Sequence, residues 1–469
     1  MTSLPASVAA GHPATAAVGR DLLRAGGSAA DAVAAMILAG CVSETLFTGL
    51  GGGGFATVYE AATGQVHCLD FFVAVPGLDG TVPAPARDIK VAFGDVEVPY
   101  AVGGPSVAVP GTPAGVAALH RSFGRLEWSQ IVAPARELAA NGTPFPMQHA
   151  VLLPDVAAAM VLGDGVAVYS RPDGAGGRRH LGPGELLHHE GLARTLDDYL
   201  NDGPEALTTG AFGRAFVAAV RADGGALSDV DMATYRVENL TVARTRFGPG
   251  VICVRDNDLD RFALTAELLE RAVADRDPVE RARRLARALR APARRAETTT
   301  LVAVDPDGNA CAATHSLGLG SGIWHGGVHG NSMLGEGELL RARMEPGERM
   351  PSMMVPLVVT GPDGGLLAAG GAAGGSRIRP ALLQVLTRVL VDGRSPAEAI
   401  AAPRMNATPD AVHLEPGFGP EVIDALEQDG ENIVQWPEQR PFFGGVALIG
   451  AGGPAADPRR GGLALRLDP

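Results

Sequence analysis

The sequence predicts a layered α+β sandwich, and three observations support this prediction. Helical patterns dominate up to about residue 290, strand patterns follow from residue 298, and further helices flank those strands. Early helices followed by strands with flanking helices are typical of layers built around one core. At 469 residues, the chain is long enough for one large core or for two lobes that share a core.

Composition indicates a globular protein whose partner is not a nucleic acid. Hydrophobic residues make up 46% of the chain and charged residues 19%, which differs from disordered sequences. The net charge of −13 argues against a nucleic-acid partner. The four cysteines have no CxxC spacing, so we expect no metal, no cofactor and no disulfide framework. Without a signal-peptide pattern or a long apolar run, we expect a cytoplasmic protein with no membrane partner.

Two helices are expected within residues 14–42, separated by Gly26 and Gly27. Ser28 and Asp31 are suited to cap the second helix, which is nearly all apolar and therefore buried. A run of four glycines, 51–54, then indicates close approach of backbone segments. A phosphate-binding loop is the alternative interpretation, but no Lys-Ser/Thr follows the glycines.

The remaining elements follow in order along the chain. A hairpin is expected from 55–60 and 66–71, followed by helices at 114–121 and 128–141. Residues 150–240 are expected to be mostly helical, with a loop at 172–177, and a further helix at 263–290 is ended by Pro292. Hairpins are expected again at 298–316, which turns at 306–309, and at 354–369. Helices at 380–390 and 396–402 and strands at 446–449 and 462–466 complete the chain.

The junction before Thr298 is the strongest candidate for chemistry. A helix ends there, a short polar loop follows, and a hydroxyl residue opens a strand. Such a hydroxyl can attack the preceding carbonyl, and hydrolysis of the resulting ester would release a new N-terminus. The α-amine so formed, with an ordinary pKa near 8, would serve as the base for the same residue. A plain β-forming threonine run is the alternative interpretation.

Seven segments of the chain resemble the γ-glutamyltranspeptidase family, and they occur in the family's order. They are GGSAADAVAA, GLGGGGFATVYEAATG, LDF, VPGTPAG, TTTLVAVDPDGNA, GGSRI and APR. The resemblance implies the four-layer αββα sandwich of N-terminal-nucleophile (Ntn) hydrolases. It also implies self-cleavage into a large subunit, 1–297, and a small subunit, 298–469, which together form one domain as an obligate heterodimer.

The resemblance also assigns catalytic residues. Matching the VAVDPDGNA segment places the family's nucleophile at Thr298 rather than at the next two threonines. The family's second hydroxyl falls on Ser316, and the glycine pair whose backbone N–H groups bind the oxyanion falls on Gly374 and Gly375. Glycines let backbone donors approach a developing charge, and each such donor is worth roughly 3–4 kcal/mol.

The residues that bind glutamate in the family are largely replaced. Phe72 stands where an arginine binds the α-carboxylate, and a phenyl ring cannot replace that contact. Ser352 matches a family serine, whereas Met353 replaces a second one and Gly318 replaces an asparagine. The acidic residue expected after Asn331-Ser332-Met333 is replaced by Leu334 and Gly335. We therefore expect a more apolar pocket that is wider near Phe72, Gly318 and Gly335.

Three functions remain open at this stage. The first is hydrolytic C–C bond cleavage of a small intermediate, as in the family's divergent relatives from antibiotic pathways that make 4-alkyl-proline units. The second is an amide hydrolase or transferase with a rebuilt pocket. The third is a non-catalytic scaffold that keeps only the fold. Self-cleavage at Thr298 would separate the first two functions from the third.

Overall fold

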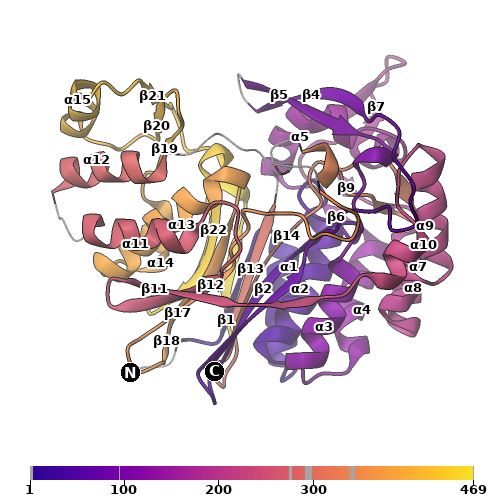
Figure 1. Ribbon diagram of the computed structural model, residues 1–469, viewed down its shortest axis with the longest axis horizontal. Helices are drawn as coiled ribbons and strands as arrows, with labels where there is room; N and C mark the ends of the chain where they lie inside the picture. The colour runs from indigo at the N-terminus through magenta and orange to yellow at the C-terminus, as the bar shows by residue number, and fades with distance from the viewer. Residues whose placement is uncertain are drawn as a thin grey trace.

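The computed structural model is a mixed α+β protein, as the sequence predicts, and two large sheets form its centre (Figure 1). It describes residues 4–93, 96–273, 277–290, 298–336, 339 and 344–467. Within these residues no helix is long and apolar enough to cross a membrane.

The first sheet has seven strands and contains the segment that begins after Thr298. All the neighbouring strands in this sheet are antiparallel. In spatial order the strands are β10 (Glu238–Leu240), β3 (Gln65–Phe71), β2 (Gly53–Glu60), β14 (Ala310–Ser316), β13 (Thr299–Val304), β1 (Ser7–Ala10) and β24 (Leu463–Arg466).

The second sheet has six strands, all of them antiparallel to their neighbours. In spatial order the strands are β11 (Val242–Phe247), β12 (Gly250–Arg255), β17 (Leu357–Thr360), β18 (Leu366–Ala373), β22 (Gly445–Gly450) and β23 (Gly453–Ala456). The two sheets pack on each other through a buried apolar cluster that draws on both, including Val302, Ala312, Val358 and Ala369.

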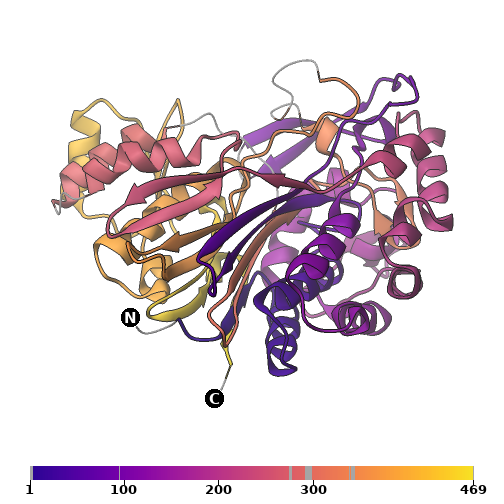
Figure 2. The same ribbon diagram turned by 60° about the horizontal axis from the view of Figure 1, so that its bottom comes forward.

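Helices cover the outer face of each sheet, and Figure 2 shows the two groups on opposite sides of the strands. On the first sheet lie α1 (Pro13–Arg24), α2 (Ala29–Ser43), α3 (Thr112–Phe123), α4 (Trp128–Asn141) and α7 (Leu192–Asp202). On the second lie α11 (Phe262–Val273), α12 (Pro278–Leu289), α13 (Ile378–Leu386), α14 (Pro396–Ala401) and α15 (Pro420–Gln428). The remaining helices are α5 (Met147–Met160), α6 (Gly165–Tyr169), α8 (Pro204–Thr208), α9 (Ala211–Ala222) and α10 (Asp229–Thr234).

Smaller strands lie outside the two sheets. Hairpins are formed by β4 (Arg87–Phe93) with β5 (Val96–Val102), β7 (Ser170–Pro172) with β8 (Arg178–His180), and β15 (Trp324–His325) with β16 (Val328–His329). β6 (Thr143–Pro144) pairs with β9 (Leu186–Leu187), and β19 (Met405–Ala407), β20 (Val412–Leu414) and β21 (Ile433–Gln435) form a three-stranded sheet.

Most expected elements are present, but two expected helices differ and several strands were not expected, among them β4, β5, β11, β12 and β1. The helix expected at 263–290 is two helices, because Asp277 caps a new start at Pro278, and Pro292 lies outside the described residues. The helix expected at 380–390 ends at Leu386 and continues as one π-helical turn. The N-terminal strand β1 was not expected, since its sequence SVAA has too few residues to show a strand pattern.

Candidate active site

Four residues lie in a row at one end of the central strands of the first sheet, namely Thr298, Ser316, Gly53 and Phe72. Gly53 on β2 pairs with Ser316 on β14, and Thr299 on β13 pairs with His315. Extending that register by one residue puts Thr298 opposite Ser316, and the β2–β3 register likewise puts Phe72 opposite Gly53. Side chains opposed in this way have Cβ atoms about 4.5–5.5 Å apart. Phe72 is three strand spacings, or about 14 Å, from Thr298.

The glycine run beside this end of the sheet permits the close packing that the sequence indicates. A Cβ atom built on Gly52 would lie 2.1 Å from the carbonyl oxygen of Ser316, and one on Gly51 would lie 2.2 Å from that of His329. Any larger residue would therefore push apart the strand that carries Ser316. The glycines have a structural role here, and a phosphate site is not needed to explain them.

The three threonines alternate between the two faces of β13. Thr299 Oγ1 donates to Glu44 Oε2 at 2.5 Å on the helix-covered face. Thr300 faces the second sheet, because a Cβ atom on Gly371 of β18 would lie 2.4 Å from its hydroxyl oxygen. Successive side chains of a strand point to opposite faces, so Thr298 shares the inner face with Thr300. Thr298 is buried, at 1% exposure.

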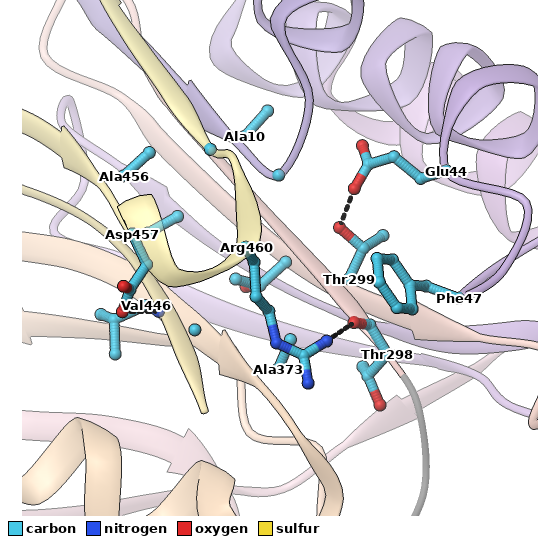
Figure 3. Close-up of a pocket in the computed structure, with 15 residues that line it drawn as sticks. Ala10, Glu44, Phe47, Thr298, Thr299, Ala373, Val446, Ala456, Asp457 and Arg460 are labelled. Carbon is cyan, nitrogen blue, oxygen red and sulfur yellow. Dashed lines mark hydrogen bonds between the residues drawn. The ribbon is translucent and has the colours of Figure 1, made fainter. Parts of the chain in front are cut away.

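Arg460 holds the backbone at Thr298. Its Nη1 atom donates to the Thr298 carbonyl oxygen at 3.3 Å, and its guanidinium carbon lies 5.1 Å from the centre of the Phe47 ring. Figure 3 shows the Arg460 side chain directed at Thr298. A cavity of about 20 Å³ lies among Thr298, Glu44, Phe47 and Arg460, which is room for at least one water molecule.

Glu44 is a buried carboxyl group on the helix-covered side of β13. Its Oε1 atom accepts from Thr15 at 2.9 Å, and Oε2 accepts from Thr299, as Figure 3 shows. Burial raises the pKa of Glu44, while the hydrogen bonds from Thr299 and Thr15 and the charge of Arg460 lower it. The sequence did not identify Glu44 or Arg460, because neither lies in a spacing that predicts a site.

Gly374 and Gly375 lie between β18 and α13, close to Arg460. Their φ angles are +124° and +59°, which favour glycine, and Gly375 opens a 3-10 turn that leads into the helix. A Cβ atom on Gly374 would lie 3.5 Å from Arg460 Nη2. Backbone N–H groups at the start of a helix are suited to bind a developing negative charge. The structure therefore brings the glycine pair to the same arginine as Thr298.

Phe72 is held in an apolar cluster. It is 1% exposed and stacks on Phe55, with ring centres 5.5 Å apart at 28°. Met333 and Met353 belong to the same buried cluster. The guanidinium carbon of Arg255 lies over the Phe55 ring, 3.9 Å from its centre. The Phe72 ring therefore lies in an apolar environment inside the core.

Ser352 and Met353 lie in the loop before β17, and both are buried. The Ser352 hydroxyl accepts from the Met354 N–H at 3.2 Å, and its carbonyl accepts from Arg255. Arg255 also donates to the Met354 carbonyl at 2.8 Å. This buried guanidinium thus organises the loop through backbone carbonyls.

The expected widening near Gly318 and Gly335 is wrong. A Cβ atom on Gly335 would lie 1.8 Å from the Ala101 carbonyl, so the backbone closes there. Polar groups fill the space beside Gly318, where a Cβ atom would lie 2.8 Å from Tyr100 Oη, 2.8 Å from Glu336 Oε1 and 2.9 Å from Ser332 Oγ.

Glu336 is a carboxylate that the sequence comparison missed. It lies two residues beyond Leu334 and is buried, and Tyr100 Oη donates to its Oε1 atom at 2.9 Å. The same Tyr100 oxygen is 2.7 Å from Ser332 Oγ, and the charge of Glu336 contributes, after burial, to the raised pKa of Tyr100. The Glu336 carboxyl group thus lies beside Gly318 and Ser332, although the two positions that match the family's acidic residue are Leu334 and Gly335.

Comparison with known proteins agrees with this arrangement. The family model described as gamma-glutamyltranspeptidase matches residues 15–257 and 260–466. The acylase ACY 1 proenzyme of Pseudomonas sp. (strain V22) is 27% identical, over 94% of this chain and 89% of its own. The glutathione hydrolase proenzyme of Pseudomonas aeruginosa is also 27% identical, over 99% and 95%. The crystal structure of cephalosporin acylase from Bacillus halodurans superposes with a TM-score of 0.80 at 22% identity, over 99% and 96%.

Proposed function

We propose that this chain, which belongs to the γ-glutamyltranspeptidase family, is a self-processing N-terminal-threonine hydrolase whose acyl substrate is not a γ-glutamyl group. One observation carries the proposal. The row that aligns Thr298 with Ser316 ends at a buried, apolar Phe72 where the family's arginine would bind glutamate. Thr298 has the Ser316 hydroxyl opposite it, whereas Phe72 stands where the family's arginine would bind the glutamate carboxylate.

Self-cleavage would precede Thr298 and give segments 1–297 and 298–469. In this step Thr298 Oγ1 attacks the carbonyl before it, the C–N bond breaks, and water hydrolyses the ester. The two segments would stay together, because β1 of the first lies between β13 and β24 of the second. Both relatives named above are called proenzymes. We take the helix–sheet–sheet–helix order to be the Ntn-hydrolase sandwich, formed jointly by the two segments.

In the reaction itself, the Thr298 hydroxyl would attack the substrate carbonyl while the new α-amine accepts the hydroxyl proton. The guanidinium of Arg460, which donates to the Thr298 carbonyl, disfavours a second positive charge nearby and so would favour the neutral form of that amine. Backbone N–H groups of Gly374 and Gly375 would bind the oxyanion, and the Ser316 hydroxyl would orient Thr298. The leaving group takes the proton, and water then hydrolyses the acyl-threonine ester.

The leaving group distinguishes two candidate activities. The first activity is amide hydrolysis, since the ACY 1 relative and the superposed cephalosporin acylase are named as acylases. The second is C–C cleavage of a small 4-alkyl-proline intermediate in antibiotic biosynthesis, which the lost clamp at Phe72 favours. Both use the same attack on a carbonyl, and only the stability of the departing anion or amine differs.

Two measurements test this function. Intact-mass analysis of the purified protein should find two fragments whose boundary is the bond before Thr298. Those fragments should release p-nitroaniline from γ-glutamyl-p-nitroanilide far more slowly than a glutathione hydrolase does. An uncleaved chain that is active would refute the mechanism, and ordinary γ-glutamyl turnover would refute the substrate assignment.

A further inference from the structure

A second cavity adjoins Arg460 on the side away from Phe72. It encloses about 120 Å³ between α5 and the segments before β22. Its walls include the guanidinium groups of Arg377, Arg440 and Arg460, the rings of Trp436 and Phe442, and one carboxyl group, that of Asp155. We call it the arginine pocket. Among the wall residues that the structure describes, cationic groups therefore outnumber carboxyl groups, in a protein whose net charge is −13.

Two of these guanidinium groups are buried and held in place. Arg377 is 6% exposed, donates from Nε to the Phe442 carbonyl at 3.0 Å, and lies 4.9 Å from the centre of the Phe442 ring. Arg460 is 7% exposed and donates to the Thr298 carbonyl. Arg440 is at the rim, half exposed, and pairs with Glu438. Guanidinium groups fixed in this way match the planar fork of a carboxylate.

Planar side chains form another wall of the arginine pocket. Trp436 and Phe442 stack with ring centres 4.6 Å apart at 22°. Trp436 Nε1 donates to His413 Nδ1 at 3.2 Å, which fixes the indole. Both rings are only partly buried, so they present apolar surface to a ligand. A ligand that fits here combines a negative group with a flat apolar part.

The arginine pocket and Phe72 lie on opposite sides of the proposed nucleophile. From β13, the sheet continues through β14 and β2 to β3 and Phe72 in one direction. In the other direction it continues through β1 to β24, and Arg460 lies in the turn Pro458–Arg460 shortly before β24. Arg460 also lines the small cavity that contains Thr298. A ligand in the arginine pocket would therefore reach Thr298 from the side opposite to the family's glutamate clamp.

We propose that the arginine pocket binds the carboxylate of the substrate's acyl part, which is a planar, aromatic or conjugated acid. This inference rests on the proposed function for the identity of the nucleophile, but the binding of the acid does not require catalysis. It would reverse the orientation of the substrate. The anionic end would lie toward Arg377 and Arg460, on the side of Thr298 opposite to Phe72.

Isothermal titration calorimetry of the protein as purified, with phenylacetate as the probe, tests the proposal. Phenylacetamide is the neutral control of the same shape. We expect phenylacetate to bind and phenylacetamide to bind at least tenfold more weakly, since a hydrogen bond to a charged group is worth roughly tenfold to hundredfold in affinity. Arg377→Gln should weaken phenylacetate by a similar factor, and Arg377→Lys should recover part of the loss.

Two further variants keep the test decisive. Arg214→Gln changes the net charge equally at an exposed site whose Nη1 donates to the Thr209 carbonyl, and it should bind phenylacetate like the wild type. If the Arg377 variants do not fold, the rim variant Arg440→Glu should lower the affinity about tenfold by charge reversal. Equal binding of both probes, or unchanged binding by Arg440→Glu, would overturn the pocket assignment. Self-cleavage, read on a denaturing gel, reports separately on the proposed function.

Discussion

Thr298 and Thr299 are adjacent residues with opposite orientations on β13, so alanine at each position separates chemistry from packing. Thr298→Ala removes the proposed nucleophile, and we expect neither cleavage nor activity. Thr299→Ala removes the hydroxyl that donates to Glu44 at 2.5 Å, together with the buried γ-methyl group. We expect this second variant to cleave itself and to keep activity, but to unfold more easily than the wild type.

The size of that loss follows from the environment of Glu44. A hydrogen bond to a buried charged group contributes about 1.5–3 kcal/mol to folding stability. Thr15 still donates to the other oxygen of Glu44, at 2.9 Å. We therefore expect Thr299→Ala to lower the free energy of unfolding by about 1.5 kcal/mol, at the lower end of that range.

The loss should depend on pH. Burial raises the pKa of Glu44 above its ordinary value of 4.5, and the Thr299 hydrogen bond opposes this by stabilising the ionised form. Without Thr299, the folded-state pKa rises further. Below pH 4.5 both folded and unfolded chains hold the proton, and the variant loses little through this carboxyl group. Between pH 4.5 and the folded-state pKa of the wild type, the unfolded chain releases the proton first and both proteins lose the same stability. The additional loss of the variant grows as pH rises from the folded-state pKa of the wild type to the higher one of the variant.

Urea unfolding at pH 4.5 and pH 8, monitored by circular dichroism, measures this difference. Thr63→Ala, at an exposed turn, is the control and should match the wild type at both values. A Thr299→Ala chain that remains whole while Thr298→Ala is cleaved would move the nucleophile by one residue. An equal loss at both pH values would refute the role given to Glu44.

Three further outcomes follow from buried groups. Phe72→Arg should lower the free energy of unfolding by about 3–5 kcal/mol, because the cation enters an apolar cluster. Thermal melts should show this destabilisation, and a γ-glutamyl-p-nitroanilide assay should show no restored activity. Burial lowers the pKa of His149 to about 3, so stability is lost as pH falls from 6.5 toward 3; His149→Phe should shift acid unfolding, followed by fluorescence, to lower pH. Asp457→Asn removes the carboxylate 2.6 Å from buried Arg404 and should cost about 3–5 kcal/mol in urea unfolding, while Asp410→Asn, at an exposed turn, should cost nothing.

The sequence pattern predicted those elements that are determined by contacts between residues close together in the chain. Ser28 and Asp31 form the capping box at the start of α2, as their spacing indicates. The strands β13 and β14 flank the turn at 306–309 that the Pro-Asp-Gly-Asn sequence predicts. In both cases the deciding contacts lie within a few residues of each other, so the sequence pattern contains the information.

The candidate site could be predicted only in part, because its remaining members come together by tertiary packing. Thr298 and Ser316 lie on one hairpin, and their register follows from the turn between them. Arg460 reaches Thr298 from 162 residues away, and Tyr100 reaches Glu336 from 236 residues away. No spacing along the chain encodes either contact. Alignment by position also fails for Glu336, since the backbone turn at Met333–Gly335 moves its carboxyl group beside Gly318.

In the proposed function, the charges at this end of the sheet would let the protein bind an acid although Phe72 stands at the position of the family's arginine. Substrate would approach Thr298 along one of two directions of the sheet. Toward β3 it meets the apolar cluster of Phe72 and, beyond Ser316, the buried carboxyl group of Glu336. Toward β24 it meets Arg460 and then Arg377. A carboxylate approaching from the first side would be desolvated beside a like charge, whereas from the second it would meet two fixed guanidinium groups. The proposed nucleophile would therefore act on a substrate whose carboxylate lies on the side of Thr298 opposite to that of the family's glutamate carboxylate.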